Sequence, residues 1–101
     1  MATNNVRTPA VERLLTGISL LETADERYEF LLDACTLREI HDIAQRLEVA
    51  ERLDSGEIYM DIQEATGASA TTIARVGKCL HYGEGGYRVV IDRLNALSAE
   101  K

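Results

Sequence analysis

The 101-residue sequence has few residues of several types, and each scarcity narrows what the chain can be. One proline and five aromatic residues (four tyrosines and one phenylalanine) suit a chain built of helices. The two cysteines, Cys35 and Cys79, fall within helical patterns, so we expect buried thiols of a reduced protein rather than a disulfide. The first apolar run, Leu14 to Leu21, is interrupted by polar residues and predicts neither a secretory signal nor a membrane span. We expect a cytoplasmic protein.

Basic residues are also scarce, since 11 Lys and Arg stand against 17 Asp and Glu and give a net charge of −6. This balance argues against a nonspecific nucleic-acid binder, which is normally basic. It does not exclude a specific one, because the local potential governs docking. The acidic residues are concentrated before residue 65, and the segment 65–83 has none. That segment carries Arg75, Lys78 and His81 instead.

Patterns that indicate catalysis or metal binding are missing. Cys79 lies two residues before His81, a spacing that does not direct two ligands toward one tetrahedral metal. The segment Gly83 to Gly86 follows a helical pattern rather than a strand and lacks the lysine of a phosphate-binding loop. No spacing places serine, histidine and aspartate as nucleophile, base and orienting group. We therefore expect a protein that is not an enzyme and holds no metal or cofactor.

Helix-start and helix-stop signals predict six helices and no strand. Thr8 precedes Pro9 at the first start, and capping boxes at Thr23–Glu26 and Thr36–Glu39 open the second and third helices. Gly56 ends the third and longest helix. The sequence thus predicts one all-α domain over residues 1–101. Apolar stripes on the first, second and last helices are broad for so short a chain, so we expect part of that surface to face a second copy.

The segment from Ile58 to Leu80 predicts two short helices joined by a tight turn. Gly67 stands where the chain must turn and where a positive φ is needed. Ser69 can cap the second helix. This is the layout of a helix-turn-helix motif, here over about residues 58–82. The residues expected on the inner faces are Ile58 and Ile62 in the first helix and Ile73, Val76 and Leu80 in the second.

The second helix of such a motif enters the major groove of DNA. Small side chains let its backbone approach the bases, and Thr hydroxyl and methyl groups can contact base edges. The expected DNA-contacting residues are Ser69, Ala70, Thr71, Thr72, Ala74, Arg75 and Lys78, of which the two cations would hold the DNA backbone. The alternative is an ordinary corner between two helices, and Gln63 stands where these motifs usually have a small residue.

Beyond this motif, the chain resembles the Trp repressor family, and within it the YerC/YecD group, from about Leu21 to Leu97. The resemblance implies a six-helix protomer, an intertwined homodimer and a helix-turn-helix in each half. The segments that carry it, in order, are Thr36-x-x-Glu39, Arg46-Leu-x-Val49, Leu53-x-x-Gly56-Glu57, Thr66-Gly-Ala-Ser69, Thr72-Ile-x-Arg75-Val76 and Gly83-x-Gly-Gly-Tyr87.

The resemblance also implies an effector pocket between the long helix and the second helix of the motif. Val76 stands where the Trp repressor has a glycine that leaves room for the indole ring, so we expect no tryptophan sensing. In a closed pocket, Arg46 would be solvated or ion-paired, with Glu48 or Glu57 as its partner in the second case. The pocket residues that the resemblance implies are Thr36, Arg46, Arg75, Val76 and Cys79.

Together these observations predict a bacterial, homodimeric, sequence-specific DNA-binding transcriptional regulator that acts without tryptophan. Its expected partner is double-stranded DNA with a palindromic operator. One alternative is a repressor that responds to an unknown small-molecule effector bound between Arg46 and Arg75. The other is a helical protein-interaction module that has lost DNA binding.

Overall fold

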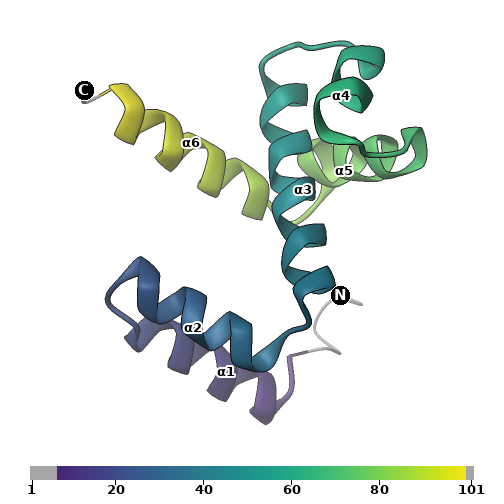
Figure 1. Cartoon of the computed structure of the whole chain (residues 1–101). Helices are drawn as coiled ribbons and strands as arrows, with labels where there is room; N and C mark the ends of the chain where they lie inside the picture. Colours follow the sequence, from purple (N-terminus) through teal and green to yellow (C-terminus); the bar gives the residue numbers. More distant parts are fainter. Residues whose placement is uncertain (1–6, 100–101) are drawn as a thin grey trace. The chain divides into compact units, whose positions relative to one another are not determined.

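The computed structural model describes residues 7–99, which form six α-helices and no strand, as the sequence predicts. The chain divides into two compact units, residues 1–40 and residues 41–101. The helices, labelled in Figure 1, are α1 (Pro9–Leu20), α2 (Ala24–Ala34), α3 (Leu37–Asp54), α4 (Tyr59–Thr66), α5 (Ala70–Tyr82) and α6 (Gly86–Ala99).

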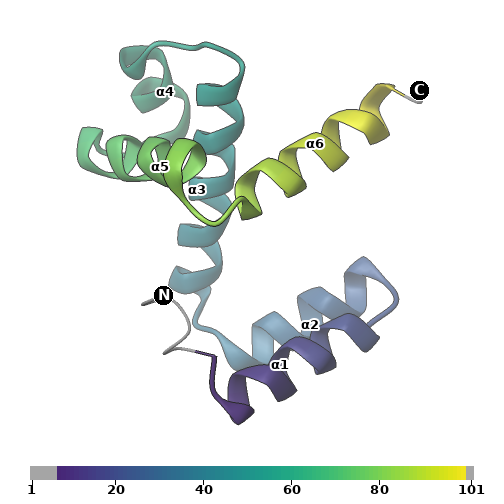
Figure 2. The same cartoon turned by 180° about the vertical axis from the view of Figure 1, so that it is seen from behind.

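In the N-terminal unit, α1 and α2 lie side by side (Figures 1 and 2). Thr8 caps α1, since its hydroxyl accepts a hydrogen bond from the backbone N–H of Val11 at 3.2 Å. The predicted capping box of α2 is present, with the hydroxyl of Thr23 accepting from the N–H of Glu26 at 3.0 Å. Neither helix contains a buried residue. The exposed apolar side chains of the two helices include Leu14, Leu15, Ile18, Leu20, Phe30, Leu31 and Leu32.

The long helix α3 begins and ends where the sequence predicts. At its start the Thr36 hydroxyl accepts from the N–H of Glu39 at 3.0 Å, and the Thr36 N–H donates to the Glu39 carboxylate at 2.8 Å. Its end is followed by Gly56, whose φ of 90° is a left-handed conformation that favours glycine. Local hydrogen bonds therefore fix both ends of the helix that supports the helix-turn-helix.

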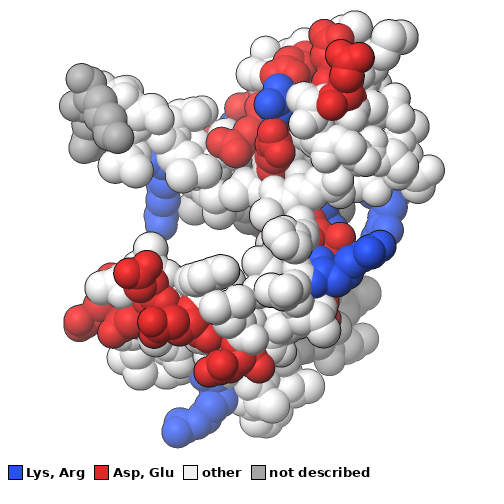
Figure 3. Space-filling model, in the orientation of Figure 1, with Lys and Arg blue, Asp and Glu red and all other residues white. Residues whose placement is uncertain are grey.

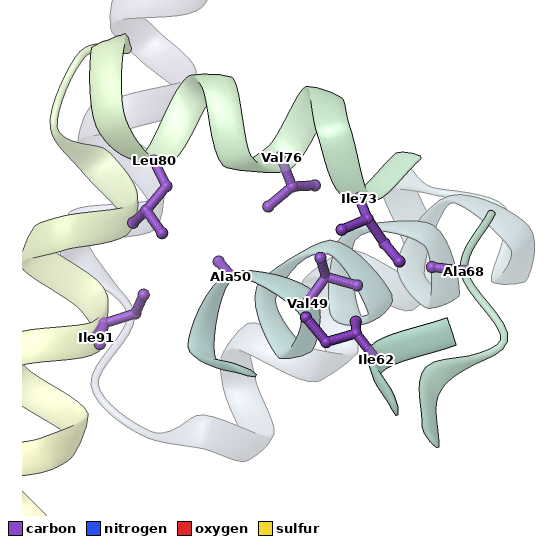
Figure 4. Close-up of a cluster of buried hydrophobic side chains, with 8 residues drawn as sticks. All are labelled: Val49, Ala50, Ile62, Ala68, Ile73, Val76, Leu80 and Ile91. Atoms are coloured by element: carbon purple, nitrogen blue, oxygen red, sulfur yellow. The ribbon is translucent and has the colours of Figure 1, made fainter. Parts of the chain in front are cut away.

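The C-terminal unit has a compact apolar core at the crossing of α3 and α5 (Figure 4). The side chains of Val49 and Ala50 from α3 face those of α4 and α5, and the first turns of α6 close the cluster through Ile91. The buried apolar residues of the core are Val49, Ala50, Ile62, Ala68, Ile73, Val76, Leu80 and Ile91.

Helix α6 is held to the end of α3 by an ion pair as well as by Ile91. Arg88 donates to both carboxylate oxygens of Asp54 and also pairs with Asp92 at 3.0 Å. The Arg88 guanidinium lowers the pKa of the Asp54 carboxyl, and the two carboxylates raise the pKa of Arg88. The remaining apolar residues of α6 are left exposed, and they include Val89, Val90, Leu94 and Leu97.

Two predictions about apolar residues are wrong. Ile58 is 62% exposed, because it is the N-cap residue of α4 and precedes the helical turn that carries Ile62 inward. Cys35 is half-buried and Cys79 is exposed, and both are free thiols. Cys79 is exposed although it follows the inner residue Val76, because it lies on the flank of α5 beside the hollow described below.

Candidate nucleic-acid interface

The turn between α4 and α5 is fixed by hydrogen bonds on both sides of Gly67. Gly67 has a φ of 76°, and its N–H donates to the carbonyl of Gln63 at 2.9 Å. The hydroxyl of Thr66 donates to the carbonyl of Ile62 at 2.7 Å and accepts from the N–H of Ala68 at 3.1 Å. From α3, the Gln45 amide donates to the carbonyl of Thr66 at 3.1 Å. The turn is therefore tied to the long helix as well as to itself.

Helix α5 starts at the predicted cap. The Ser69 hydroxyl accepts from the N–H of Thr72 at 3.1 Å and also bonds to the Thr72 hydroxyl at 3.1 Å. These bonds satisfy one of the free N–H groups at the helix start and engage both hydroxyls with each other. Ser69 and Thr72 thus have a structural role that the sequence prediction gave only to Ser69.

The inner face of α5 anchors it to the rest of the unit. Ile73, Val76 and Leu80 are buried, as predicted from their spacing. Gly77 is buried between them, and a methyl group at this position would contact Leu53 at 3.5 Å. This is an ordinary van der Waals distance, so α5 and α3 lie close enough at Gly77 for a methyl group to fill the space between them.

The outer face of α5 is accessible along its whole length. Thr71, Arg75 and Lys78 follow each other at steps of four and three residues and are all exposed, on the side away from Ile73 and Val76. Ala70 and Ala74 are exposed beside them. Thr72 is set apart from this face, because it is half-buried and lines a hollow between α3 and α5. The structure therefore brings five of the seven predicted DNA-contacting residues onto one open face: Ala70, Thr71, Ala74, Arg75 and Lys78.

The charge of α5 differs from that of α4 in the same unit and from that of α2 in the N-terminal unit. On the side drawn in Figure 3, acidic side chains gather over α2 and over the region of α4. Helix α4 carries Asp61 and Glu64, whereas α5 has no acidic residue. Among residues 7–99, neither Arg75 nor Lys78 forms an ion pair with a carboxylate. Both cations are thus available to an anionic partner.

A hollow of about 330 Å³ lies between α3 and α5, where the resemblance implies an effector pocket. Four of the five implied residues line it: Arg46, Arg75, Val76 and Cys79. Val76 is only 3% exposed and forms part of its wall while packing in the core. The hollow persists beside Val76. That this side chain excludes tryptophan stays a prediction.

The sequence prediction missed the other residues that line this hollow, which are Asp42, Gln45, Thr72 and Tyr87. Asp42, Gln45 and Arg46 stand three and four residues apart, so their common face on α3 could have been read from the spacing. Tyr87 is brought in from the start of α6, which only the tertiary structure decides. The fifth implied residue, Thr36, belongs to the N-terminal unit and caps α3.

The expected pairing of Arg46 with Glu48 or Glu57 is wrong. Arg52 takes both carboxylates, Glu48 at 3.1 Å and Glu57 at 3.1 Å. These hydrogen bonds raise the pKa of Arg52. The reason is helical geometry, because Glu48 and Arg52 are four residues apart on one face of α3. Arg46 is exposed and makes no ion pair within the described part of the chain.

A second hollow, of about 650 Å³, lies where α3, the end of α5 and the start of α6 meet. Its walls are mostly apolar, with Ile43, Leu47 and Val90 among them. It shares Arg46, Cys79 and Tyr87 with the first hollow. Such an apolar groove beside the exposed face of α6 leaves a substantial apolar surface without a partner in this protomer.

The arrangement of α4, the Gly67 turn and α5 is that of helix-turn-helix proteins. A family model described as Trp repressor protein matches residues 10–95, and the chain belongs to this family. The resemblance inferred from the sequence is thereby confirmed.

Known relatives agree with this assignment. The chain is 40% identical over 100 residues to the YerC protein of Bacillus subtilis strain 168, covering 99% of this chain and 96% of YerC. A solved TrpR-like protein from Eubacterium eligens is 47% identical with a TM-score of 0.87, covering 91% of this chain and 95% of that one. A solved protein from Staphylococcus aureus, whose name assigns it as a Trp repressor, is 38% identical with a TM-score of 0.88. The match covers 94% of this chain and 95% of that one.

Within residues 7–99 no group of three or more His, Cys, Asp or Glu side chains is placed to hold a metal ion. None of the described helices is both long and apolar enough to cross a membrane.

Proposed function

We propose that the protein is a homodimeric, sequence-specific DNA-binding regulator of transcription whose α5 helix enters the major groove. The observation that carries this proposal is the outer face of α5, where Thr71, Arg75 and Lys78 are exposed opposite a buried face. Membership of the Trp repressor family supports it. A helix with free cations, no acidic residue and small side chains near its start suits the groove and the flanking phosphates.

The exposed apolar residues support the dimer. Helices α1 and α2 contain no buried residue within the protomer. The exposed apolar face of α6 adjoins the open groove lined by Ile43, Leu47 and Val90. Soluble monomers seldom leave so much apolar surface in water. A second copy of the same chain is the partner that symmetry favours. In this dimer the two units of each protomer would act as one domain.

Two-fold symmetry then sets the form of the DNA site. Two α5 helices related by a two-fold axis would bind a palindrome whose half-sites lie about one helical turn apart. Each protomer offers Arg75 and Lys78 to the phosphates, and Arg46 lines the same hollow as Arg75. With about four to six such contacts per dimer, log affinity should fall with log salt at a slope of about −4 to −5.

Selection of binding sites from random duplexes tests this function. We expect one palindrome to be enriched by the wild-type protein. Lys78→Ala should weaken binding to all sequences alike and reduce the salt slope, while Lys78→Arg, which keeps the charge, should restore both. Selection that enriches no palindrome would contradict the proposal and favour the protein-interaction module.

A second candidate function is a regulator that responds to a small effector, and the hollow between α3 and α5 favours it. Its volume is near the lower end of the range for small-molecule sites, which is about 300–1,000 Å³. Arg46 and Arg75 both line it without a carboxylate partner among residues 7–99. An effector would have to bind the DNA-competent state more tightly in order to shift the equilibrium.

Calorimetry with tryptophan tests the role that both candidates give to Val76. We expect no tryptophan binding up to millimolar ligand, and no change of DNA affinity when tryptophan is added. Tryptophan binding with micromolar affinity would refute the role given to Val76. Val76→Gly, which enlarges the hollow at a helix cost of about 1 kcal/mol and at a further cost for the core packing that Val76 makes, is the matched variant for this experiment once circular dichroism shows that it is folded.

A further inference from the structure

We infer that Thr71 determines the base preference of α5, and that the base it reads is a thymine, contacted through the thymine 5-methyl group. This inference rests on the proposed function, because it assumes that α5 lies in the major groove. It assigns to one side chain a role that the sequence spread over several small residues.

Hydrogen bonding separates Thr71 from the other two hydroxyl residues at the start of α5. The Ser69 and Thr72 hydroxyls are bonded to each other at 3.1 Å, and the Ser69 hydroxyl also accepts from the Thr72 N–H. Thr72 is half-buried against the hollow. Thr71 is exposed, and its hydroxyl makes no hydrogen bond with any of residues 7–99. Thr71 is therefore the hydroxyl residue of this helix start that can face DNA.

The position of Thr71 fits the part of a recognition helix that meets base edges. It is the second residue of α5, and the N-terminal residues of recognition helices contact the bases. Arg75 and Lys78 lie on the same exposed face, four and seven residues further along. Cations at those positions can hold phosphates and so fix the depth and register at which Thr71 enters the groove.

The chemistry around Thr71 favours thymine. Its exposed neighbours Ala70 and Ala74 offer only methyl groups, and Thr71 itself has a methyl group and a hydroxyl. Thymine shows a methyl group and the O4 acceptor in the major groove, and apolar contact from Ala or Thr is a standard way to recognise that methyl. A guanine or cytosine edge could take a hydrogen bond from the Thr71 hydroxyl, but it would offer no apolar partner to the methyl groups of Thr71, Ala70 and Ala74.

The test uses the palindrome enriched by the full-length wild-type protein. Each thymine is replaced in turn, symmetrically in both half-sites, by deoxyuridine, which lacks only the 5-methyl group. We expect one position at which the loss weakens wild-type binding by about fourfold per half-site, the value of one buried methyl group. Thr71→Ser, which lacks the methyl group but keeps the hydroxyl, should bind the thymine and deoxyuridine duplexes equally. Thr71→Val, which keeps methyl groups, should still distinguish them.

The possible failures are distinct. If no palindrome is enriched, the proposed function fails before Thr71 is tested. If a palindrome is enriched but deoxyuridine is tolerated at every position, the thymine contact is refuted while the proposed function stands. If Thr71→Ser discriminates as strongly as the wild type, an alanine reads the methyl group and the role of Thr71 is refuted. Helical circular dichroism confirms that each variant is folded, and the wild-type comparison decides the thymine contact without any variant.

Discussion

The two units of this chain contain similar helices but differ in what holds them together. Helices α1 and α2 have complete N-terminal caps and contain no buried residue, whereas the C-terminal unit encloses a core of eight buried residues from α3 to α6. The difference shows that capping and helical pattern place a helix, while burial decides whether a group of helices is stable alone. In the proposed dimer a second copy would cover the unit without a core, and the unit with a core can present α5 in a fixed position.

The largest effect should come from emptying the core of the C-terminal unit. Ile62 is fully buried, so Ile62→Ala should lower the free energy of unfolding by about 2–5 kcal/mol. Ile58, four residues earlier, is 62% exposed, and Ile58→Ala should change it by no more than about 0.5 kcal/mol. Urea denaturation measures both. If both variants lost the same free energy of unfolding, the burial of Ile62 and the exposure of Ile58 would be contradicted.

A charge on the apolar face of the N-terminal unit should break the dimer. Leu31 on α2 is 36% exposed within the protomer, and Leu31→Glu should weaken dimerisation by about 2 kcal/mol or more, because it would place a charge in the proposed interface. Sedimentation over a dilution series measures this. Glu29→Gln, at an exposed polar position on the same helix, is the control and should leave the dimer intact. If Leu31→Glu left dimerisation unchanged, the second copy would bind at a surface that does not include Leu31.

Removal of a cap tests how far local hydrogen bonds matter in the unit that has a core. Ser69→Ala removes the hydroxyl that accepts from the Thr72 N–H and should lower the free energy of unfolding by about 1 kcal/mol. Ser98→Ala, at an exposed position near the end of α6, should have little effect. Thermal unfolding of the three proteins gives the comparison. A Ser69→Ala protein as stable as the wild type would show that the Ser69 cap contributes nothing measurable.

The smallest effect should be the pH dependence that comes from the attachment of α6 to α3. The pKa of Asp54 is lowered in the folded protein from its ordinary 3.8, chiefly by hydrogen bonds from Arg88. The stabilisation is therefore fully present above about pH 5 and is lost progressively as the pH falls through 3.8 and then through the folded pKa. Asp54→Asn should remove this part of the acid dependence in denaturation experiments at pH 2 to 6. An unchanged acid profile in Asp54→Asn would contradict the assignment.

The prediction from sequence succeeded where structure depends on near neighbours. Thr8, Thr23 and Thr36 mark helix starts because a hydroxyl can reach the N–H three residues ahead in almost any surroundings. Gly67 marks the turn because its positive φ disfavours other residues. The spacing of Ile73 and its buried partners likewise follows from the helical repeat alone. The position of each helix start, the turn at Gly67 and the buried face of α5 were therefore predictable from the sequence.

What the tertiary structure decided was the partner of each exposed or half-buried side chain. The sequence contained no sign that Tyr87, at the start of α6, would line the hollow between α3 and α5. The sequence predicted DNA contact equally for Thr71 and Thr72. In the structure, the packing of α5 on α3 directs Thr72 toward the hollow and leaves Thr71 exposed on the outer face. These choices depend on the distance and rotation between helices, which are set by contacts between residues far apart in sequence. Local pattern carries no information about them.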